Sequence, residues 1–452
     1  MRNFILSLFT GDLLLGLIAI FIAFSLAFAT LDAAALFTTM NLSKAAIFIL
    51  VMLFSSFVAE VYRYDKQMDQ QKTAARIIFS LSLSFFTLAA VDMFFPNLTF
   101  DQRVIIISLF FYGVFQFIWH IVYTTWDRMS GFSKRVLILG TGPLAQQMGE
   151  LIATPNRQHA LLGYFDCSDN PVLVPKGKVL GNGKGLAEIV RKLKAHKVVV
   201  SLKERRGIFP LEDILSCKLS GVEVVDAPSF YEEMTGKLLL EDINPSWFIF
   251  SDGFRVTTFR KLIKRMLDVC CSLLGLALVS PLLPLIALLI RLDSRGPVFF
   301  KQTRVGEGGK DFVIMKFRTM REDAEANGAV WAEEEDPRIT RVGKWLRKTR
   351  LDEVPQLFNV LGGTMSFVGP RPERPEFVQM LKEVIPYYGE RHYVKPGITG
   401  WAQVSYPYGS SVEDAIEKLR YDLYYIKNLS ITFDILIILK TIHVVLFGKG
   451  GR

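Results

Sequence analysis

Two adjacent carboxylates, Asp352 and Glu353, follow a basic run and precede a short apolar helix pattern that ends at Gly362 and Gly363. The residues of that basic run are Arg338, Arg341, Lys344, Arg347, Lys348 and Arg350. The spacing predicts Asp352 at a helix start, with Pro355 in the first turn, where free backbone N–H groups favour an anion. Such a position among arginines should also keep the carboxylate ionised. An anion among cations suits a reaction on phosphate, although an N-capping Asp beside a solvated Glu gives the same pattern.

Two further segments could hold phosphate. Pro370 and Pro372 flank Arg371 and restrict the backbone, so that this arginine is presented from a stiff segment. The strand pattern DFVIMKFRTM places Lys316 and Arg318 on one face by its period of two. These two cations are a candidate phosphate-facing pair, and a solvated strand face is the alternative.

Three longer stretches, LDEVPQLFNVL, SFVGPRP and KPGITGWAQV, occur in the order found in the bacterial sugar transferase family. From about Thr258 to the C-terminus, the chain resembles that family's polyprenyl-phosphate sugar-1-phosphate transferases, the monotopic phosphoglycosyl transferases. The upstream half is similar to the larger members, which place four membrane spans and a nucleotide-fold-like module before the catalytic part.

The resemblance implies transfer of a hexose-1-phosphate from a UDP-sugar, with glucose or galactose expected, to undecaprenyl phosphate. UMP would be released, and the reaction would initiate exopolysaccharide assembly. Asp352 would be the nucleophile that carries the phosphosugar, Glu353 its acid/base or positioning partner, and Arg347 and Arg371 the phosphate clamps. Mg²⁺ would neutralise the diphosphate, with Asp352 as its protein ligand. Thr364 departs from the family pattern, which usually has Asp or Glu there, so the role of that acid is not carried over.

Four apolar segments begin the chain, at residues 4–29, 42–59, 77–95 and 104–125. Each is close to the roughly 20 residues that a membrane helix needs. The loop between the second and third segments is basic, as is the stretch after the fourth. By the positive-inside rule, both ends of this bundle, residues 1–130, face the cytoplasm. Together with the resemblance, which implies a bacterial enzyme, this orientation predicts a protein of the inner membrane with its catalytic part on the cytoplasmic side.

Residues 131–228 alternate between strand and helix patterns, which favours a parallel, doubly wound sheet. The segment Gly140-Thr141-Gly142-Pro143-Leu144-Ala145 fits G-x-G-x-x-A at a strand-to-helix turn, and Asp166 ends a later strand. This unit is short, and no Tyr-x-x-x-Lys pair follows it. A structural Rossmann-like module is therefore favoured over a dinucleotide site. Residues 229–258 form a connector without obvious chemistry.

The predicted catalytic domain, residues 259–452, begins with an apolar stretch at residues 267–292. As a straight helix this stretch would extend about 39 Å, enough to cross a membrane. Ser280 and Pro281 at its midpoint interrupt the helix, because proline removes a backbone hydrogen bond and clashes with the preceding turn. Basic residues flank both ends: Arg260, Lys261, Lys264 and Arg265 before, and Arg291, Arg295, Lys301 and Arg304 after. The sequence predicts a re-entrant helix–break–helix with both ends cytoplasmic.

The composition fits this arrangement. Of 452 residues, 50% are hydrophobic and 36 are Phe, and the formal net charge is +9. Anionic lipid and a phosphorylated substrate explain that charge, and no motif for reading nucleic acid accompanies it. The predicted fold is a four-span membrane α-helical bundle, an α/β Rossmann-like module and an α/β catalytic domain with a re-entrant membrane helix. An NAD-dependent sugar-nucleotide enzyme, a non-catalytic membrane scaffold and a homodimer all remain open.

Overall fold

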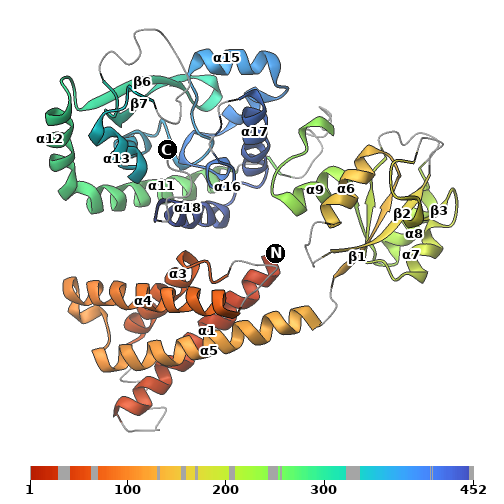
Figure 1. Ribbon diagram of the computed structural model, residues 1–452, viewed down its shortest axis with the longest axis horizontal. Coiled ribbons are helices and arrows are strands. Elements are labelled where there is room, and N and C mark those ends of the chain that lie inside the picture. The colour runs from red at the N-terminus through yellow and green to blue at the C-terminus, as the bar shows by residue number, and fades with distance from the viewer. Residues whose placement is uncertain are drawn as a thin grey trace. The chain divides into compact units, whose positions relative to one another are not determined.

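The computed structural model describes residues 2–28, 41–62, 70–129, 133–153, 159–167, 172–202, 209–242, 253–254, 257–321, 336–407, 409 and 411–446. Two compact units make up the chain, Met1–Ala227 and Pro228–Arg452. Figure 1 shows their elements, and each unit is described by itself.

Four apolar helices begin the first unit: α1 (Arg2–Phe28), α3 (Leu42–Val58), α4 (Gln70–Phe94) and α5 (Gln102–Met129), with the short η1 (Pro96–Leu98) before α5. By length and composition, Ser7–Phe28, Thr73–Phe94 and Gln102–Tyr123 could each cross a membrane, and α3 is an apolar helix of 17 residues. The prediction of four apolar helices is therefore confirmed.

Several buried polar side chains of this bundle are paired between helices. Gln116 Nε2 in α5 donates to Asp12 Oδ2 in α1 at 2.6 Å and to Ser56 Oγ in α3 at 3.1 Å. The hydroxyl of Ser56 lies 3.0 Å from that of Ser80 in α4. Because unpaired polar groups are costly at membrane depth, this chain of contacts favours one arrangement of the four helices.

The same unit contains a five-stranded parallel sheet. Its elements are β1 (Lys134–Leu139), α6 (Pro143–Ala153), β2 (His159–Asp166), η2 (Lys176–Lys178), β3 (Val179–Asn182), α7 (Leu186–Lys192), β4 (Lys197–Val200), α8 (Leu211–Leu219) and β5 (Glu223–Asp226). The strand order is β3-β2-β1-β4-β5, and all neighbours pair in parallel. The last four residues of β1 and all of β4 are buried, as expected for apolar strands with helices on both faces. The predicted parallel α/β fold is confirmed.

The first Gly of the G-x-G-x-x-A segment ends β1. Gly140 has φ +118°, a conformation that favours glycine, and a Cβ there would lie 3.2 Å from the Ser201 carbonyl oxygen. Thr141 Oγ1 donates to Oδ1 of Asp166, at the end of β2, at 2.9 Å. Asp166 therefore connects the glycine-containing turn to the neighbouring strand β2.

The second unit is α/β. Its elements are α9 (Ala227–Thr235), η3 (Leu240–Asp242), α11 (Thr258–Val279), η4 (Ser280–Leu282), α12 (Leu283–Asp293), β6 (Phe299–Val305), η5 (Glu307–Gly309), β7 (Asp311–Phe317), α13 (Arg341–Thr349), η6 (Leu351–Glu353), α14 (Gln356–Leu361), β8 (Ser366–Val368), α15 (Pro375–Val384), η7 (Tyr388–Tyr393), β9 (Gly397–Thr399), α16 (Trp401–Ser405), α17 (Val412–Lys427) and α18 (Ile431–Leu446). Strands β6 and β7 form an antiparallel hairpin, and β8 pairs with β9 in parallel.

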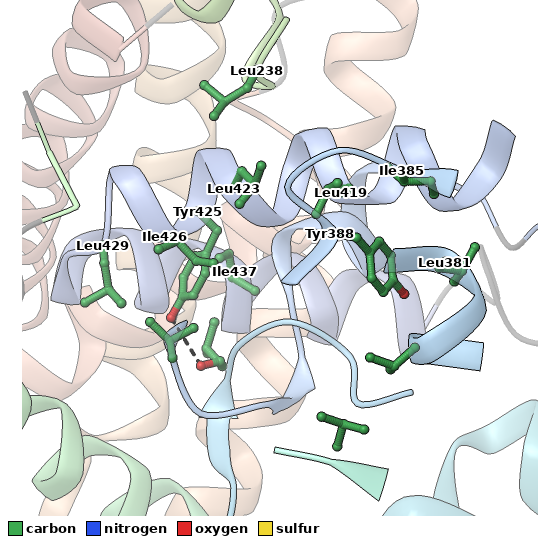
Figure 2. Close-up of a cluster of buried hydrophobic side chains, with 14 residues drawn as sticks. Leu238, Leu381, Ile385, Tyr388, Leu419, Leu423, Tyr425, Ile426, Leu429 and Ile437 are labelled. Carbon is green, nitrogen blue, oxygen red and sulfur yellow. Dashed lines mark hydrogen bonds between the residues drawn. The ribbon is translucent and has the colours of Figure 1, made fainter. Parts of the chain in front are cut away.

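The main core of this unit lies between α15, α17 and α18. Figure 2 shows the cluster, in which Leu419, Leu423 and Ile426 of α17 pack with Leu381 of α15 and Ile437 of α18. The hydroxyl of Tyr425 in the same cluster donates to the carbonyl of Val368 at 3.2 Å. This core therefore supports the end of β8, where the Gly-Pro-Arg-Pro segment begins.

The apolar stretch at the start of the unit is broken where the sequence predicts. The one-turn η4 separates α11 from α12, and Figure 1 shows α12 turning steeply away from α11. Asp268 of α11 accepts from the backbone N–H of Phe367 at 2.9 Å, and Asp293 of α12 accepts from that of Val342 at 2.9 Å. Both arms are thus attached to the same α/β unit, while the leucines around the break are exposed: Leu273, Leu274, Leu278, Leu282, Leu285 and Leu288.

Part of the predicted connector packs on this unit. Leu238 belongs to its main core, and its N–H donates to the carbonyl of Arg420 in α17 at 3.1 Å. Trp401 Nε1 donates to the carbonyl of Gly236 at 2.8 Å. Residues 243–252, also in the connector, lie outside the described residues.

Candidate active site

Asp352 and Glu353 lie in η6, between α13 and α14. Arg350 ends α13 with φ +59°, which turns the chain into this short 3-10 helix. The prediction that Asp352 begins an α-helix is wrong by a few residues, since α14 begins at Gln356 with Pro355 as its N-cap. The segment before Pro355 instead takes the tighter i→i+3 pattern, in which the N–H groups of Glu353 and Val354 donate to the carbonyls of Arg350 and Leu351.

Glu353 is held by two cations on different elements. Its Oε1 accepts from Nζ of Lys316 in β7 at 3.1 Å and from a guanidinium nitrogen of Arg371 at 2.8 Å. Burial alone would raise the pKa of Glu353, but the charges of Arg371, Lys316 and Arg350 outweigh it and hold that pKa well below its usual range. Burial also lowers the pKa of Lys316. Glu353 is therefore a fixed anion.

Asp352 is equally buried, at 7% exposed, but differs in its partners. Its Oδ1 accepts no hydrogen bond from the residues that the structure describes. Burial, and next the charge of Glu353, raise the pKa of Asp352 to about 6, against the opposing charges of Lys316, Arg347 and Arg371. The expectation that nearby arginines hold Asp352 fully ionised is thus corrected, because desolvation is the larger effect. Above pH 6 its ionised form still predominates.

Arg347 reaches this site from α13. Its Nε donates to Oγ1 of Thr319 at 2.9 Å, and its charge acts on Asp352. Helix α13 approaches the end of β7 closely at Gly343, where a Cβ would lie 2.1 Å from the carbonyl oxygen of Thr319. The N–H of Thr340, the N-cap of α13, donates to the same oxygen at 3.0 Å. A glycine at 343 is therefore what lets Arg347 take this position.

The backbone around Arg371 is held by hydrogen bonds on both sides, from the main chain of β9 and from the side chain of Arg304 in β6. The N–H of Gly369 donates to Thr399 at 2.8 Å, and the carbonyl of Pro370 accepts from Gly397 at 2.9 Å. On the other side of the arginine, the carbonyl of Pro372 accepts from Arg304 at 3.2 Å. The stiff segment predicted from its prolines is thus also paired with β9 and β6.

A buried arginine that the sequence analysis missed supports the same segment. Arg391 donates to the carbonyl of Arg371 at 2.9 Å, to Asp422 at 2.8 Å and to the hydroxyl of Tyr388 at 2.6 Å. Burial raises the pKa of Asp422 to about 6, although Arg391 opposes this shift. Arg391 lies among polar residues of η7, and α17 contains several charged residues besides Asp422, so neither residue stood out in the sequence.

Lys316 and Arg318, predicted to face phosphate together, have different partners. Lys316 contacts Glu353, whereas one guanidinium nitrogen of Arg318 donates to the carbonyl and hydroxyl of Ser294, at 2.7 and 3.0 Å. Ser280 and Pro281 lie in η4, and Ser280 Oγ donates to the carbonyl of Ala277 at 2.9 Å. The structure therefore groups Asp352, Glu353, Lys316, Arg371 and Arg347, while Arg318 points to the end of α12.

Thr364, where the family usually has an acid, follows α14. Its hydroxyl donates to the carbonyl of Asn359 at 3.1 Å. The Asn359 side chain accepts from the N–H of Met315 at 3.1 Å and donates to the carbonyl of Val313 at 2.7 Å. It thus makes the two backbone hydrogen bonds to β7 that a neighbouring strand would make. Thr364 thus helps to end α14 and supplies no carboxylate.

This arrangement can bind and react with phosphate. A carboxylate oxygen without a donor is set beside a second carboxylate that anchors two cations. The described residues contain no group of three or more metal-ligating side chains. Mg²⁺ often binds through one or two carboxylates and substrate phosphates, and the Asp352 side chain could supply one such carboxylate.

Comparison with known proteins identifies the second unit. Residues 259–448 match the family described as bacterial sugar transferase. The chain is 43% identical to the UDP-N-acetylgalactosamine-undecaprenyl-phosphate N-acetylgalactosaminephosphotransferase of Aeromonas hydrophila over 236 residues. This match covers 52% of this chain and 55% of that protein. The chain is 37% identical over 332 residues to the undecaprenyl-phosphate glucose phosphotransferase of Komagataeibacter xylinus, covering 71% of this chain and 60% of that one. The chain thus spans less than two thirds of these two relatives.

A third relative is matched over more of its length. The UDP-glucose:undecaprenyl-phosphate glucose-1-phosphate transferase of Escherichia coli (strain K12) is 34% identical over 327 residues, 70% of this chain and 69% of that protein. The family match runs from α11 to α18 and so includes both carboxylates and all three cations grouped around them. These findings confirm the resemblance that the three sequence motifs indicate, and the chain belongs to the bacterial sugar transferase family.

Proposed function

We propose that this protein transfers a hexose-1-phosphate from a UDP-sugar to undecaprenyl phosphate, through a covalent phosphosugar on Asp352, and so initiates exopolysaccharide assembly. The observation that carries the proposal is the difference between the two acids. Glu353 is bonded to Lys316 and Arg371, whereas a buried oxygen of Asp352 accepts no bond from the described residues. A nucleophile needs such an oxygen.

The reaction divides into two displacements. In the first, a carboxylate oxygen of Asp352 attacks the sugar-bearing phosphorus, the bond from that phosphorus to the UMP oxygen breaks, and UMP leaves. In the second, a phosphate oxygen of undecaprenyl phosphate attacks the same phosphorus, which forms the lipid diphosphate and releases the Asp352 carboxylate. No further reactant is needed.

The cations stabilise charge during these steps. Arg371, with its backbone fixed by β9 and Arg391, and Lys316 would contact the donor phosphates, and Arg347 would add charge next to Asp352. Glu353 holds the first two cations in place, which is a positioning role. Mg²⁺ bound through Asp352 and the donor phosphates would neutralise the diphosphate.

The sugar is a hexose or its N-acetyl derivative. The printed names of the relatives include glucose and N-acetylgalactosamine. A screen should therefore include UDP-glucose, UDP-galactose and UDP-N-acetylgalactosamine.

We further propose that α11, η4 and α12 form a re-entrant membrane element, with the catalytic unit on the cytoplasmic side of the inner membrane. Asp268 and Asp293, on opposite arms of the break, both bond to the same α/β unit, which a single spanning helix would not allow. The exposed leucines around η4 would enter the lipid, and basic residues flank both arms.

The parallel-sheet module is proposed to be Rossmann-like and structural. Its Asp166 bonds to Thr141 of the glycine-containing turn, which supports a use of this acid within the fold rather than on a ribose.

The test is UMP release by the purified full-length protein with each UDP-sugar. Without lipid acceptor, the wild type should give a single-turnover burst of UMP, and Asp352→Asn should give none. The phosphosugar adduct should map to the peptide containing Asp352. Glu353→Gln serves as the control, because it should slow the burst by changing cation positions and still form the adduct. Near-normal turnover by Asp352→Asn, or no UMP until acceptor is added, would refute the covalent route.

A further inference from the structure

Among the described residues, the guanidinium of Arg318 is buried without a counter-charge. Arg318 is 5% exposed, and one nitrogen donates to the carbonyl and hydroxyl of Ser294. Among the described residues, the other two nitrogens, Nε and NH1, are buried without a hydrogen-bond partner, and no carboxylate pairs with this arginine. A buried cation in this condition is costly, so its retention points to an anion that binds there.

The position of Arg318 connects the catalytic acids with the membrane element. Lys316 lies in β7, two residues before Arg318, and its side chain contacts Glu353. Along an extended backbone, two residues span about 7 Å. Between them, Phe317 packs with Ile286 and Ile290 of α12 in a buried cluster. A ligand at Arg318 would therefore lie beside α12, on the same segment as the lysine of the Lys316–Glu353 pair.

The exposed face of α12 is mostly apolar. Leu285, Leu288 and Leu292 lie along one side of α12 and are 52%, 55% and 74% exposed. Ser294, the partner of Arg318, is the residue that ends α12. An anion bound by Arg318 would thus have lipid-facing leucines on one side and the catalytic carboxylates on the other. The donor UDP-sugar has no long apolar part, so this setting fits an amphiphile with a phosphate head.

We propose that Arg318 binds the phosphate of the polyprenyl phosphate acceptor. This inference rests on the proposed function and assigns its two substrates to different cations. Lys316 and Arg371, bonded to Glu353, serve the donor, and Arg318, bonded to Ser294, serves the acceptor. Arg318 then acts in the second displacement, by holding the attacking phosphate, and has no part in UMP release.

The experiment separates the two displacements in full-length protein reconstituted in bilayers of neutral phospholipid. Arg318→Gln removes the charge and keeps a polar side chain, and Arg318→Lys keeps the charge. Arg295→Gln is the matched control, because Arg295 is exposed, follows Ser294 directly and loses the same charge. The measurements are the UMP burst without acceptor, the KM for the UDP-sugar, and the KM for polyprenyl phosphate.

Arg318→Gln should keep the burst amplitude and the donor KM within about twofold, and raise the acceptor KM by about tenfold to a hundredfold, the range of a hydrogen bond to a charged group. Arg318→Lys should lie between it and the wild type, and Arg295→Gln should stay within about twofold. If Arg318→Gln does not fold, the acceptor KM of Arg318→Lys is the test: a raised value supports the proposal, and a wild-type value overturns it. An unchanged acceptor KM, or equal losses in burst and acceptor use, would overturn the proposal.

A second arm distinguishes the acceptor from a phospholipid headgroup. The same proteins are assayed with and without an anionic phospholipid in the bilayer. If Arg318 serves the acceptor, the ratio of acceptor KM between Arg318→Gln and wild type should not depend on that lipid. A defect that appears only with anionic phospholipid would overturn the assignment. If the wild type gives no burst, the covalent route fails, while the acceptor KM comparison still tests Arg318.

Discussion

Arg371 donates to the same oxygen of Glu353 that accepts from Lys316, at 2.8 and 3.1 Å. Two cations from separate parts of the unit therefore share a single carboxylate oxygen, and the neighbouring Asp352 does not have this support. The two acids are adjacent in sequence and similarly buried, but their pKa values move in opposite directions from the usual values. This asymmetry gives them separate roles and makes the following effects measurable.

Neutralising the two acids should change stability with opposite signs. The pKa of Asp352 is raised from its usual 3.8 to about 6, so at pH 7 the fold bears the cost of an ionised buried carboxylate. Asp352→Asn removes that cost, worth up to about 3 kcal/mol, and should raise the melting temperature. Glu353→Gln leaves Lys316 and Arg371 without their shared anion and should lower stability by about 1–3 kcal/mol. Thermal melts of both variants at pH 7 test this, and a lower melting temperature for Asp352→Asn would contradict it.

The UMP burst should depend on the ionisation of Asp352. The carboxylate is the attacking form, so its fraction falls to half near pH 6 and about tenfold for each pH unit below that. Burst rates measured from pH 8 to pH 5 should therefore be flat above about pH 7 and decline through pH 6. With a carboxylate of ordinary pKa the rate would stay flat to pH 5, and that result would show that burial does not control the nucleophile.

Gly343 and Gly142 should respond differently to the same change. A Cβ on Gly343 would lie 2.1 Å from the backbone oxygen of Thr319, which cannot move without shifting β7. Gly343→Ala should therefore destabilise the protein by about 1–3 kcal/mol and displace Arg347 from the site. A Cβ on Gly142 meets nothing within 4 Å, so Gly142→Ala is the matched control and should melt like the wild type. Equal melting temperatures for the two variants would contradict this account of α13.

The parallel-sheet module should carry no nicotinamide. The purified protein should show no nicotinamide absorbance, and Gly142→Ala should keep its transferase turnover, because the proposed chemistry uses residues of the second unit. Absorption spectra and UMP assays of both proteins measure this. Tight NAD(H) binding that Gly142→Ala abolishes would restore the alternative of an NAD-dependent enzyme, since the second glycine is the one that lets a pyrophosphate approach the backbone.

The sequence supported predictions wherever one pattern determines a local structure. Apolar length predicted the four N-terminal helices, and alternating apolar strands predicted the parallel sheet, because burial sets both patterns. Proline also predicted the interruption at Ser280 and Pro281. Proline gave the wrong start for the helix after Asp352, because Pro355 is the N-cap of α14 and not a residue of its first turn.

Partners distant in sequence could not be predicted. Arg391 is 20 residues from Arg371 and 31 from Asp422, and only folding brings the three together. Trp401 and Gly236 are 165 residues apart, so nothing in the connector sequence indicated that it packs on α16. Lys316 and Arg318 have different partners because Glu353 lies in η6 and Ser294 at the end of α12. The alternation of side chains along a strand does not predict where those two elements lie.

The re-entrant element gives the last prediction. Single cysteines near Arg260, near Arg304 and at the C-terminus should all react with a membrane-impermeant reagent from the cytoplasmic side, because α11 and α12 attach to one unit through Asp268 and Asp293. Replacing Pro281 and Pro284 by Leu restores the missing backbone hydrogen bonds and should move the Arg304 cysteine towards the periplasmic side, since a continuous helix satisfies its backbone best in lipid. Replacing Leu282 by Ala in the same segment is the control and should change nothing. Labelling of the wild-type Arg304 cysteine from the periplasm would establish a spanning helix, and the bonds of Asp268 and Asp293 to one α/β unit could not then both persist in the membrane.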